Sequence, residues 1–105
     1  MSLYKLEGNG QVTITGQLDR DTLSRDWWAM LSSAEKRQLT EAGSCLFDLT
    51  GVARADSAGL AWLINAIRDT KRHQITLRLQ AVPEKVIKLA KISGVDTLLP
   101  IDNNI

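Results

Sequence analysis

The sequence has few of the features that would each point to a particular class of protein. It contains one cysteine, Cys45, in 105 residues, so an internal disulfide is excluded and a reducing compartment is expected. No apolar run approaches the roughly 20 residues of a membrane-spanning helix, and the opening residues do not read as a secretory signal. The 13 basic and 12 acidic side chains give a formal net charge of +1, unlike the strongly basic balance of a nucleic-acid binder. We therefore expect a single cytoplasmic globular domain over residues 1–105, with no nucleic-acid partner and no direct membrane insertion.

Groups that carry catalysis or hold metals are also scarce. The single histidine, His73, is expected in the last turn of a helix, where it complements the helix dipole. Cys45 lies within an apolar predicted strand, which is typical of a small core residue rather than a nucleophile. One His and one Cys cannot make a usual zinc site, and neither GxxxxGK[ST] nor GxGxxG is present. Four carboxylates near the expected strand ends are explained more simply as helix caps and solvated loop residues: Asp19, Asp21, Asp48 and Asp56. We expect no enzymatic activity, no cofactor, no metal and no small-molecule substrate.

The hydrophobic periodicity predicts seven elements in the order β-β-α-β-α-β-α. Strands are expected over residues 3–7, 11–15, 44–49 and 75–80, with the glycines of residues 8–10 turning the first pair into a hairpin. The apolar run over 44–49 is typical of a strand covered on both faces, and 98–105 is a candidate edge segment. Helices are expected from residue 21 or 22 to 39, over 58–73, and from Pro83 to just before Gly94. Repeated strand–helix–strand units imply an α/β fold with a small, mostly parallel sheet.

The junction between the 44–49 strand and the next helix is the most informative part of the chain. Ser57 lies where its side-chain oxygen could accept hydrogen bonds from the unpaired N–H groups of the first helical turn, as an N-cap. The helix dipole favours negative charge at the same place, so a phosphoryl group or a partner's carboxylate would be stabilised there. A plain cap and a recognition site are both compatible with this pattern.

The 58–73 helix carries a tryptophan on its outward side. At about 100° per residue, its core-facing residues are Leu60, Leu63, Ile64 and Ile67. Trp62 points nearly opposite, beside Ala58 and Asn65, and Ala61 lies on the flank. An outward tryptophan suits an anchor in a partner's pocket, so we expect Trp62 to contact a partner. The alternative is that Trp62 packs beneath a loop or the C-terminal tail of its own chain.

The first helix carries two adjacent tryptophans. Trp27 belongs to its core stripe, and Trp28 is expected to be half-buried at the margin of the fold.

This junction, together with the order of elements, resembles the STAS domain family. The segments that carry the resemblance are Phe-Asp-Leu-Thr at 47–50, Val52, and Asp-Ser-Ala-Gly-Leu at 56–60. The resemblance covers nearly the whole chain and implies a small sheet with about three helices on one face. The family includes anti-sigma-factor antagonists, transporter C-terminal domains and the small cytoplasmic subunit of the Mla phospholipid-transport ABC complex.

Three segments are more similar to the Mla branch: 16–23, 56–63 and 82–90. The resemblance implies a non-catalytic subunit that binds and supports the ATPase of an inner-membrane phospholipid transporter, which maintains outer-membrane lipid asymmetry. Such a subunit would lie in the cytoplasm, peripheral to the inner membrane through its partner. The partner-binding residues implied are Asp56, Ser57, Ala58, Ala61, Trp62 and Asn65. In the antagonists, the serine that matches Ser57 is phosphorylated by a kinase, so an anti-sigma-factor antagonist regulated at Ser57 is the alternative.

Overall fold

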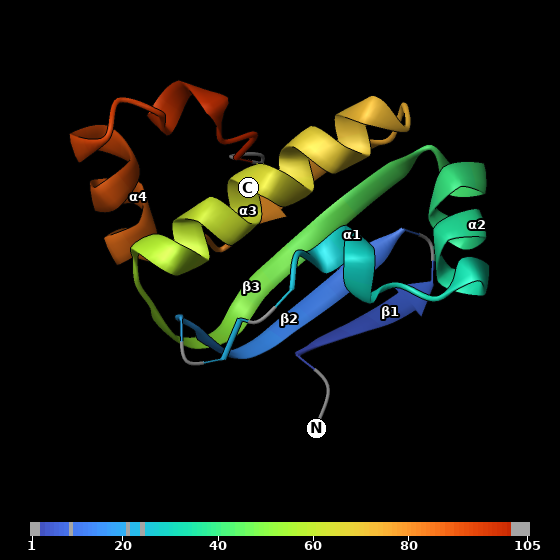
Figure 1. Cartoon of the computed structure of the whole chain (residues 1–105), viewed down its shortest axis with the longest axis horizontal. Coiled ribbons are helices and arrows are strands. Elements are labelled where there is room, and N and C mark those ends of the chain that lie inside the picture. The colour runs from blue at the N-terminus through green and yellow to red at the C-terminus, as the bar shows by residue number, and fades with distance from the viewer. Residues whose placement is uncertain (1–2, 9, 21, 24, 102–105) are drawn as a thin grey trace.

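Four strands form one sheet in which only the first pair is antiparallel. The computed structural model describes residues 3–8, 10–20, 22–23 and 25–101. The strands are β1 (Tyr4–Gly8), β2 (Gln11–Leu18), β3 (Ser44–Ala55) and β4 (Thr76–Gln80). They lie in the order β1-β2-β3-β4, with β2, β3 and β4 mutually parallel (Figure 1). The predicted α/β class, the hairpin and the mostly parallel sheet are confirmed.

Two glycines shape the hairpin between β1 and β2. Gly8 and Gly10 have φ angles of 87° and 80°, which other residues rarely adopt. A Cβ on Gly10 would also lie 2.6 Å from the carbonyl oxygen of Ser44. Asn9, predicted in the same turn, lies outside the described residues.

Two of the strands are longer than their sequences suggest. The pairing of β2 with β3 continues to Leu18 and Ala55, beyond the predicted ends at residues 15 and 49. Most residues in these extensions are polar or small, so the hydrophobic pattern does not identify them as strands. The backbone hydrogen bonds between β2 and β3 stabilise both extensions. The extended end of β3 carries the chain to the helix that begins at Ser57.

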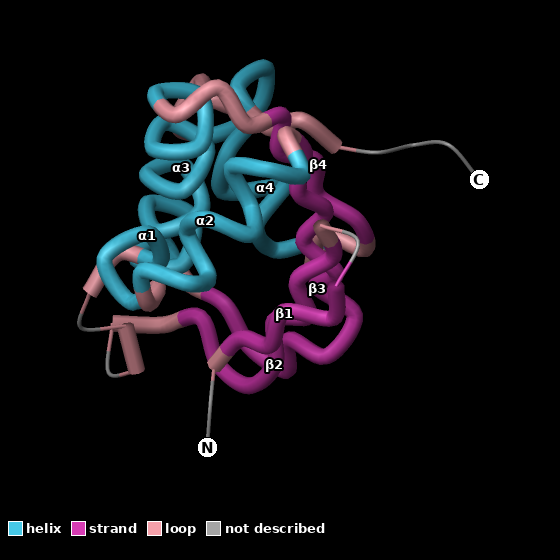
Figure 2. The backbone as a smooth tube through the Cα atoms, turned by 90° about the vertical axis from the view of Figure 1, so that its right-hand side faces the viewer, coloured by secondary structure: helices cyan, strands magenta, loops and turns pink. Residues whose placement is uncertain are grey.

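The helices lie on one face of the sheet, as Figure 2 shows for the described part of the chain. They are α1 (Trp27–Met30), α2 (Ser33–Ala42), α3 (Ser57–Arg72), α4 (Glu84–Ile92) and a short 3-10 helix, η1 (Asp96–Leu98). The predictions for α3 and α4 are confirmed to within about a residue at each end. Pro83 stands at the N-cap of α4 rather than inside it, and Gly94 follows the helix with a φ of 74°. Of the expected edge segment, Ile101 forms a parallel bridge with Leu79, and residues 102–105 lie outside the description.

The prediction of one helix from residue 21 or 22 to 39 is wrong, because the first helix begins only at Trp27 and a second helix begins at Ser33. The side chain of Ser32 accepts from the Glu35 amide at 3.1 Å, and Glu35 Oε1 accepts from the Ser32 amide at 2.8 Å. This reciprocal capping box starts α2 independently of α1. The Tyr4 hydroxyl donates to the same Oε1 at 3.0 Å. Burial, reinforced by the hydrogen bond and the charge of Glu35, raises the pKa of Tyr4 to about 12.

The hydrophobic core lies between the sheet and its helices. Its buried strand residues are Val12, Ile14, Leu18, Cys45, Phe47, Leu49, Ala55, Leu77 and Leu79. Trp27, fully buried, packs edge-on against Phe47 with ring centroids 4.7 Å apart. The prediction that residues 44–49 are covered on both faces is wrong, since Leu46 and Asp48 on the opposite face are only half-buried. Helices cover only one face of the sheet, and buried residues accordingly alternate with more exposed ones along β3.

Over the described residues, no helix has both the length and the apolar character needed to cross a membrane.

The start of α3 lies against the end of β2 at Gly59, so we expect a side chain at this position to destabilise the fold. A Cβ on Gly59 would lie 2.3 Å from the carbonyl oxygen of Leu18. Helix propensity alone would make Gly59→Ala stabilising by up to about 1 kcal/mol. We expect the reverse, a loss of about 1–3 kcal/mol in the free energy of unfolding, because the backbones must move apart. Urea denaturation measures the sign, and a variant as stable as the wild type would contradict the contact.

Candidate partner-binding site

Asp56, not Ser57, caps the helix at the junction singled out by the sequence. Asp56 has an extended backbone, and its Oδ1 accepts from the amides of Ala58 at 2.9 Å and Gly59 at 3.2 Å. The prediction that Ser57 is the N-cap is therefore wrong by one position. Ser57 is the first residue of α3, and its side chain is exposed. Its hydroxyl is available on the surface of the domain.

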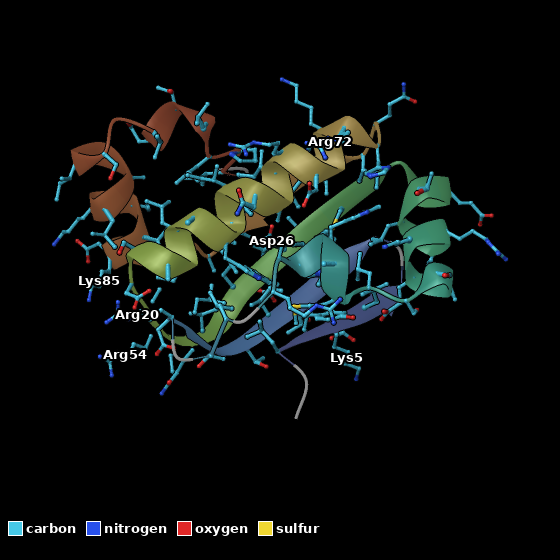
Figure 3. All side chains as sticks on the ribbon, viewed as in Figure 1. Lys5, Arg20, Asp26, Arg54, Arg72 and Lys85 are labelled. Atoms are coloured by element: carbon cyan, nitrogen blue, oxygen red, sulfur yellow. The ribbon has the colours of Figure 1, made fainter. Side chains whose placement is uncertain are left out.

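The charge of Asp56 is stabilised by its surroundings. Desolvation opposes ionisation, but the amides of Gly59, Ala58 and Arg20 and the charge of Lys85 outweigh it, so the pKa of Asp56 is lowered. The side chains of Arg20, Arg54 and Lys85 gather at this end of the molecule, near the start of α3 (Figure 3). At this junction, the carboxylate that caps α3 therefore lies near basic side chains from three separate segments.

Trp62 is buried beneath its own chain, so the prediction that it faces solvent is wrong. Its side chain is 3% exposed, and its indole Nε1 donates to the carbonyl oxygen of Arg25 at 3.0 Å. One turn further on, Asn65 Nδ2 donates to Asp26 Oδ1 at 3.1 Å. The segment that leads into α1 thus crosses the outward face of α3. The helical projection gave the direction of Trp62 correctly. The alternative expectation, that Trp62 packs beneath a loop of its own chain, is confirmed.

A groove of about 380 Å³ lies where that segment meets α3. One side is formed by Arg20, Leu23, Arg25 and Asp26, and the other by Ala58, Ala61, Trp62 and Asn65. Four of the six residues proposed from the sequence therefore come together here, and Asp56 and Ser57 stand at the start of the same helix. The four residues on the other side of the groove were not predicted from the sequence: Arg20, Leu23, Arg25 and Asp26. No local signal marked them, because the hydrophobic pattern placed residues 22–39 in one helix and the contact with Trp62 spans 37 positions of the chain.

His73, Cys45 and Asp48, which were considered for catalysis, are not among the residues that line this groove. His73 stacks on the half-buried Trp28 with ring centroids 4.3 Å apart, in keeping with the marginal position predicted for Trp28. Cys45 is buried in the core as predicted, and burial raises the pKa of its thiol to about 12. Asp48 accepts from the Thr50 amide at 3.0 Å, and Asp21 lies outside the described residues. In the described part of the chain, no three His, Cys, Asp or Glu side chains are placed to share a metal ion.

Solved structures share this architecture at low sequence identity. A putative anti-sigma factor antagonist from Thermotoga maritima superposes with a TM-score of 0.63 at 16% identity, covering 97% of this chain and 86% of the other. The anti-sigma factor antagonist SpoIIAA in its unphosphorylated form gives 0.56 at 14% identity, covering 96% and 87%. These structures share the fold of this chain, which has an opening hairpin and a mostly parallel sheet with helices on one face.

Comparisons of sequence identify the family to which the chain belongs. A family model described as "Mlab, STAS domain" matches residues 2–100. The Intermembrane phospholipid transport system binding proteins MlaB of Escherichia coli (strain K12) and Shigella flexneri are each 33% identical over 91 residues, covering 87% of both chains. The chain belongs to the STAS domain family, and within it is MlaB-like. The resemblance drawn from the sequence is confirmed.

The lowered pKa of Asp56 predicts a pH-dependent contribution to stability. A carboxylate whose pKa is lowered by folding stabilises the fold above its ordinary value of 3.8, and this contribution disappears as the pH falls through the lower folded value. Asp56→Asn keeps a capping oxygen but loses the charge. We expect the wild type to be the more stable at neutral pH, and the gap to narrow in acid. Urea denaturation from about pH 6 to about pH 3 measures this, and a gap that stays constant would contradict it.

The bond from Trp62 to Arg25 predicts a stability role for the indole N–H. Trp62→Phe retains an aromatic ring but leaves the Arg25 carbonyl without this donor, so we expect a loss of about 1–3 kcal/mol. Trp28→Phe makes the same change at a half-buried position and is expected to cost less. Equilibrium denaturation compares the two, and equal losses would show that the buried hydrogen bond contributes nothing specific.

Proposed function

We propose that this chain is a non-catalytic subunit that binds and supports the ATPase of a phospholipid ABC transporter at the cytoplasmic face of the inner membrane. The observation that carries the proposal is the 33% identity, over 87% of both chains, to relatives named as binding proteins of an intermembrane phospholipid transport system. In this role the transporter maintains outer-membrane lipid asymmetry, and the chain is held at the membrane by its partner.

The partner surface in this proposal begins at the exposed hydroxyl of Ser57. Ala58, Ala61 and Asn65 continue it along α3 and line the groove. The methyl side chains of Ala58 and Ala61 allow close approach of a second protein. Trp62 acts from beneath the surface, because its ring is buried and holds the covering segment in place. Asp56 supports the surface by capping the helix.

The contribution of such a subunit is differential binding. A protein that binds one arrangement of the ATPase more tightly than the others raises the population of that arrangement. No reacting group is needed from this chain, and the lipid need not touch it.

A matched pair of variants tests the proposal. Ser57 and Ser33 are each the first residue of a helix, and both side chains are exposed, so Asp has the same favourable interaction with the helix dipole at each. We expect Ser57→Asp to weaken co-purification with the ATPase subunit by about tenfold or more, since a charge enters the interface. Ser33→Asp should leave it unchanged. Undiminished co-purification of Ser57→Asp would place the surface elsewhere.

The exposed Ser57 also supports a second candidate, an anti-sigma-factor antagonist controlled by phosphorylation. A phosphoryl group adds about −1.5 to −2 charges, and the basic side chains at this end of the molecule would partly compensate it (Figure 3). Mass spectrometry after incubation with candidate kinases tests this role, and absence of a Ser57 phosphate counts against it. Neighbouring genes for a permease and an ATPase, rather than a kinase and a sigma factor, would favour the transporter role.

A further inference from the structure

We infer that the groove beside α3 receives one bulky apolar side chain of the ATPase subunit, carried on a segment with acidic residues next to it. This inference rests on the proposed function and specifies the chemistry of the partner. It follows from the floor of the groove, its rigidity and the charges along its rim.

The lining of the groove includes four apolar side chains, which we call its floor: Leu23, Ala58, Ala61 and Trp62. Ala58 and Ala61 present only methyl groups to it. The volume of about 380 Å³ is near the lower end of the range of roughly 300–1,000 Å³ for ligand pockets. A hollow of this size suits one large side chain rather than a whole helix.

The groove is formed before any partner arrives. Two hydrogen bonds join its walls, one from Trp62 to the Arg25 carbonyl and one from Asn65 to Asp26. The Arg25 guanidinium also donates to the Ala29 carbonyl at 2.6 Å, which holds its side chain along the segment. A prearranged cavity avoids part of the ordering cost of association.

The rim favours acidic groups on the occupant. Arg20 and Arg25 are exposed, whereas the acidic lining residue that the structure describes, Asp26, already accepts a hydrogen bond from Asn65. Guanidinium groups bind carboxylates through paired, charge-assisted hydrogen bonds. A second copy of this chain is a poorer occupant, because a symmetric contact would bring these arginines against each other.

Three exposed positions make the test. Ala61→Trp fills the groove, Arg20→Glu reverses a charge on its rim, and Arg78→Glu makes the same charge change at an exposed position on β4, outside the groove. Affinity for the purified ATPase subunit is measured at low and high salt, with circular dichroism and denaturation to establish that each variant folds.

We expect Ala61→Trp and Arg20→Glu each to weaken binding about tenfold or more, with the salt dependence reduced in Arg20→Glu. Arg78→Glu should bind like the wild type. If the wild type binds and both groove variants bind within about twofold of it, the inference is overturned while the proposed function stands. If Ala61→Trp misfolds, Arg20→Glu alone decides between these outcomes. Failure of the wild type to bind the ATPase would overturn the proposed function and this inference with it.

Discussion

The close approach of α3 to the end of β2 is the constraint on which the arrangement of the site depends. At Gly59 there is no space for a side chain in front of the Leu18 carbonyl, and the same carbonyl accepts from the Asp56 amide at 3.1 Å. This contact fixes where the helix begins and which residues of its first turn face outward. Ser57 is consequently exposed, and Ala58 and Ala61 line the groove. The glycine of the helix-start motif is thus explained by packing, independently of any partner.

A second consequence is that the outward face of α3 is partly covered by its own chain. The indole N–H of Trp62 donates to the carbonyl oxygen of Arg25, just before α1. The tryptophan side chain, whose exposure to water would be unfavourable, is therefore part of the core. What remains accessible is the border between this cover and the helix. In the proposed role, a partner would therefore meet a groove with an apolar floor and a charged rim, instead of a protruding tryptophan.

The sequence was sufficient to predict most elements, but it did not predict how they meet. Periodicity located α3 and α4 because each has a continuous buried stripe and end signals near Ser57, Pro83 and Gly94, although the N-cap of α3 is Asp56 and not Ser57. It failed between residues 21 and 39, where apolar spacing continues through Ser32 although a capping box starts a new helix there. For Trp62, a helical projection defines direction only relative to its own helix. The cover comes from a segment 37 positions away in the chain, and such contacts leave no local pattern.

The separation of the cap from the exposed serine has a functional implication. If Ser57 capped α3, any change at its hydroxyl would alter the stability of the helix as well as the surface. Because Asp56 supplies both capping bonds, the hydroxyl of Ser57 can be substituted, contacted or modified with little effect on the fold. Binding and stability can therefore vary independently at adjacent positions. A fold with this property can serve different partners by changing exposed side chains at the start of α3 while keeping the aspartate and the glycine that hold the helix in place.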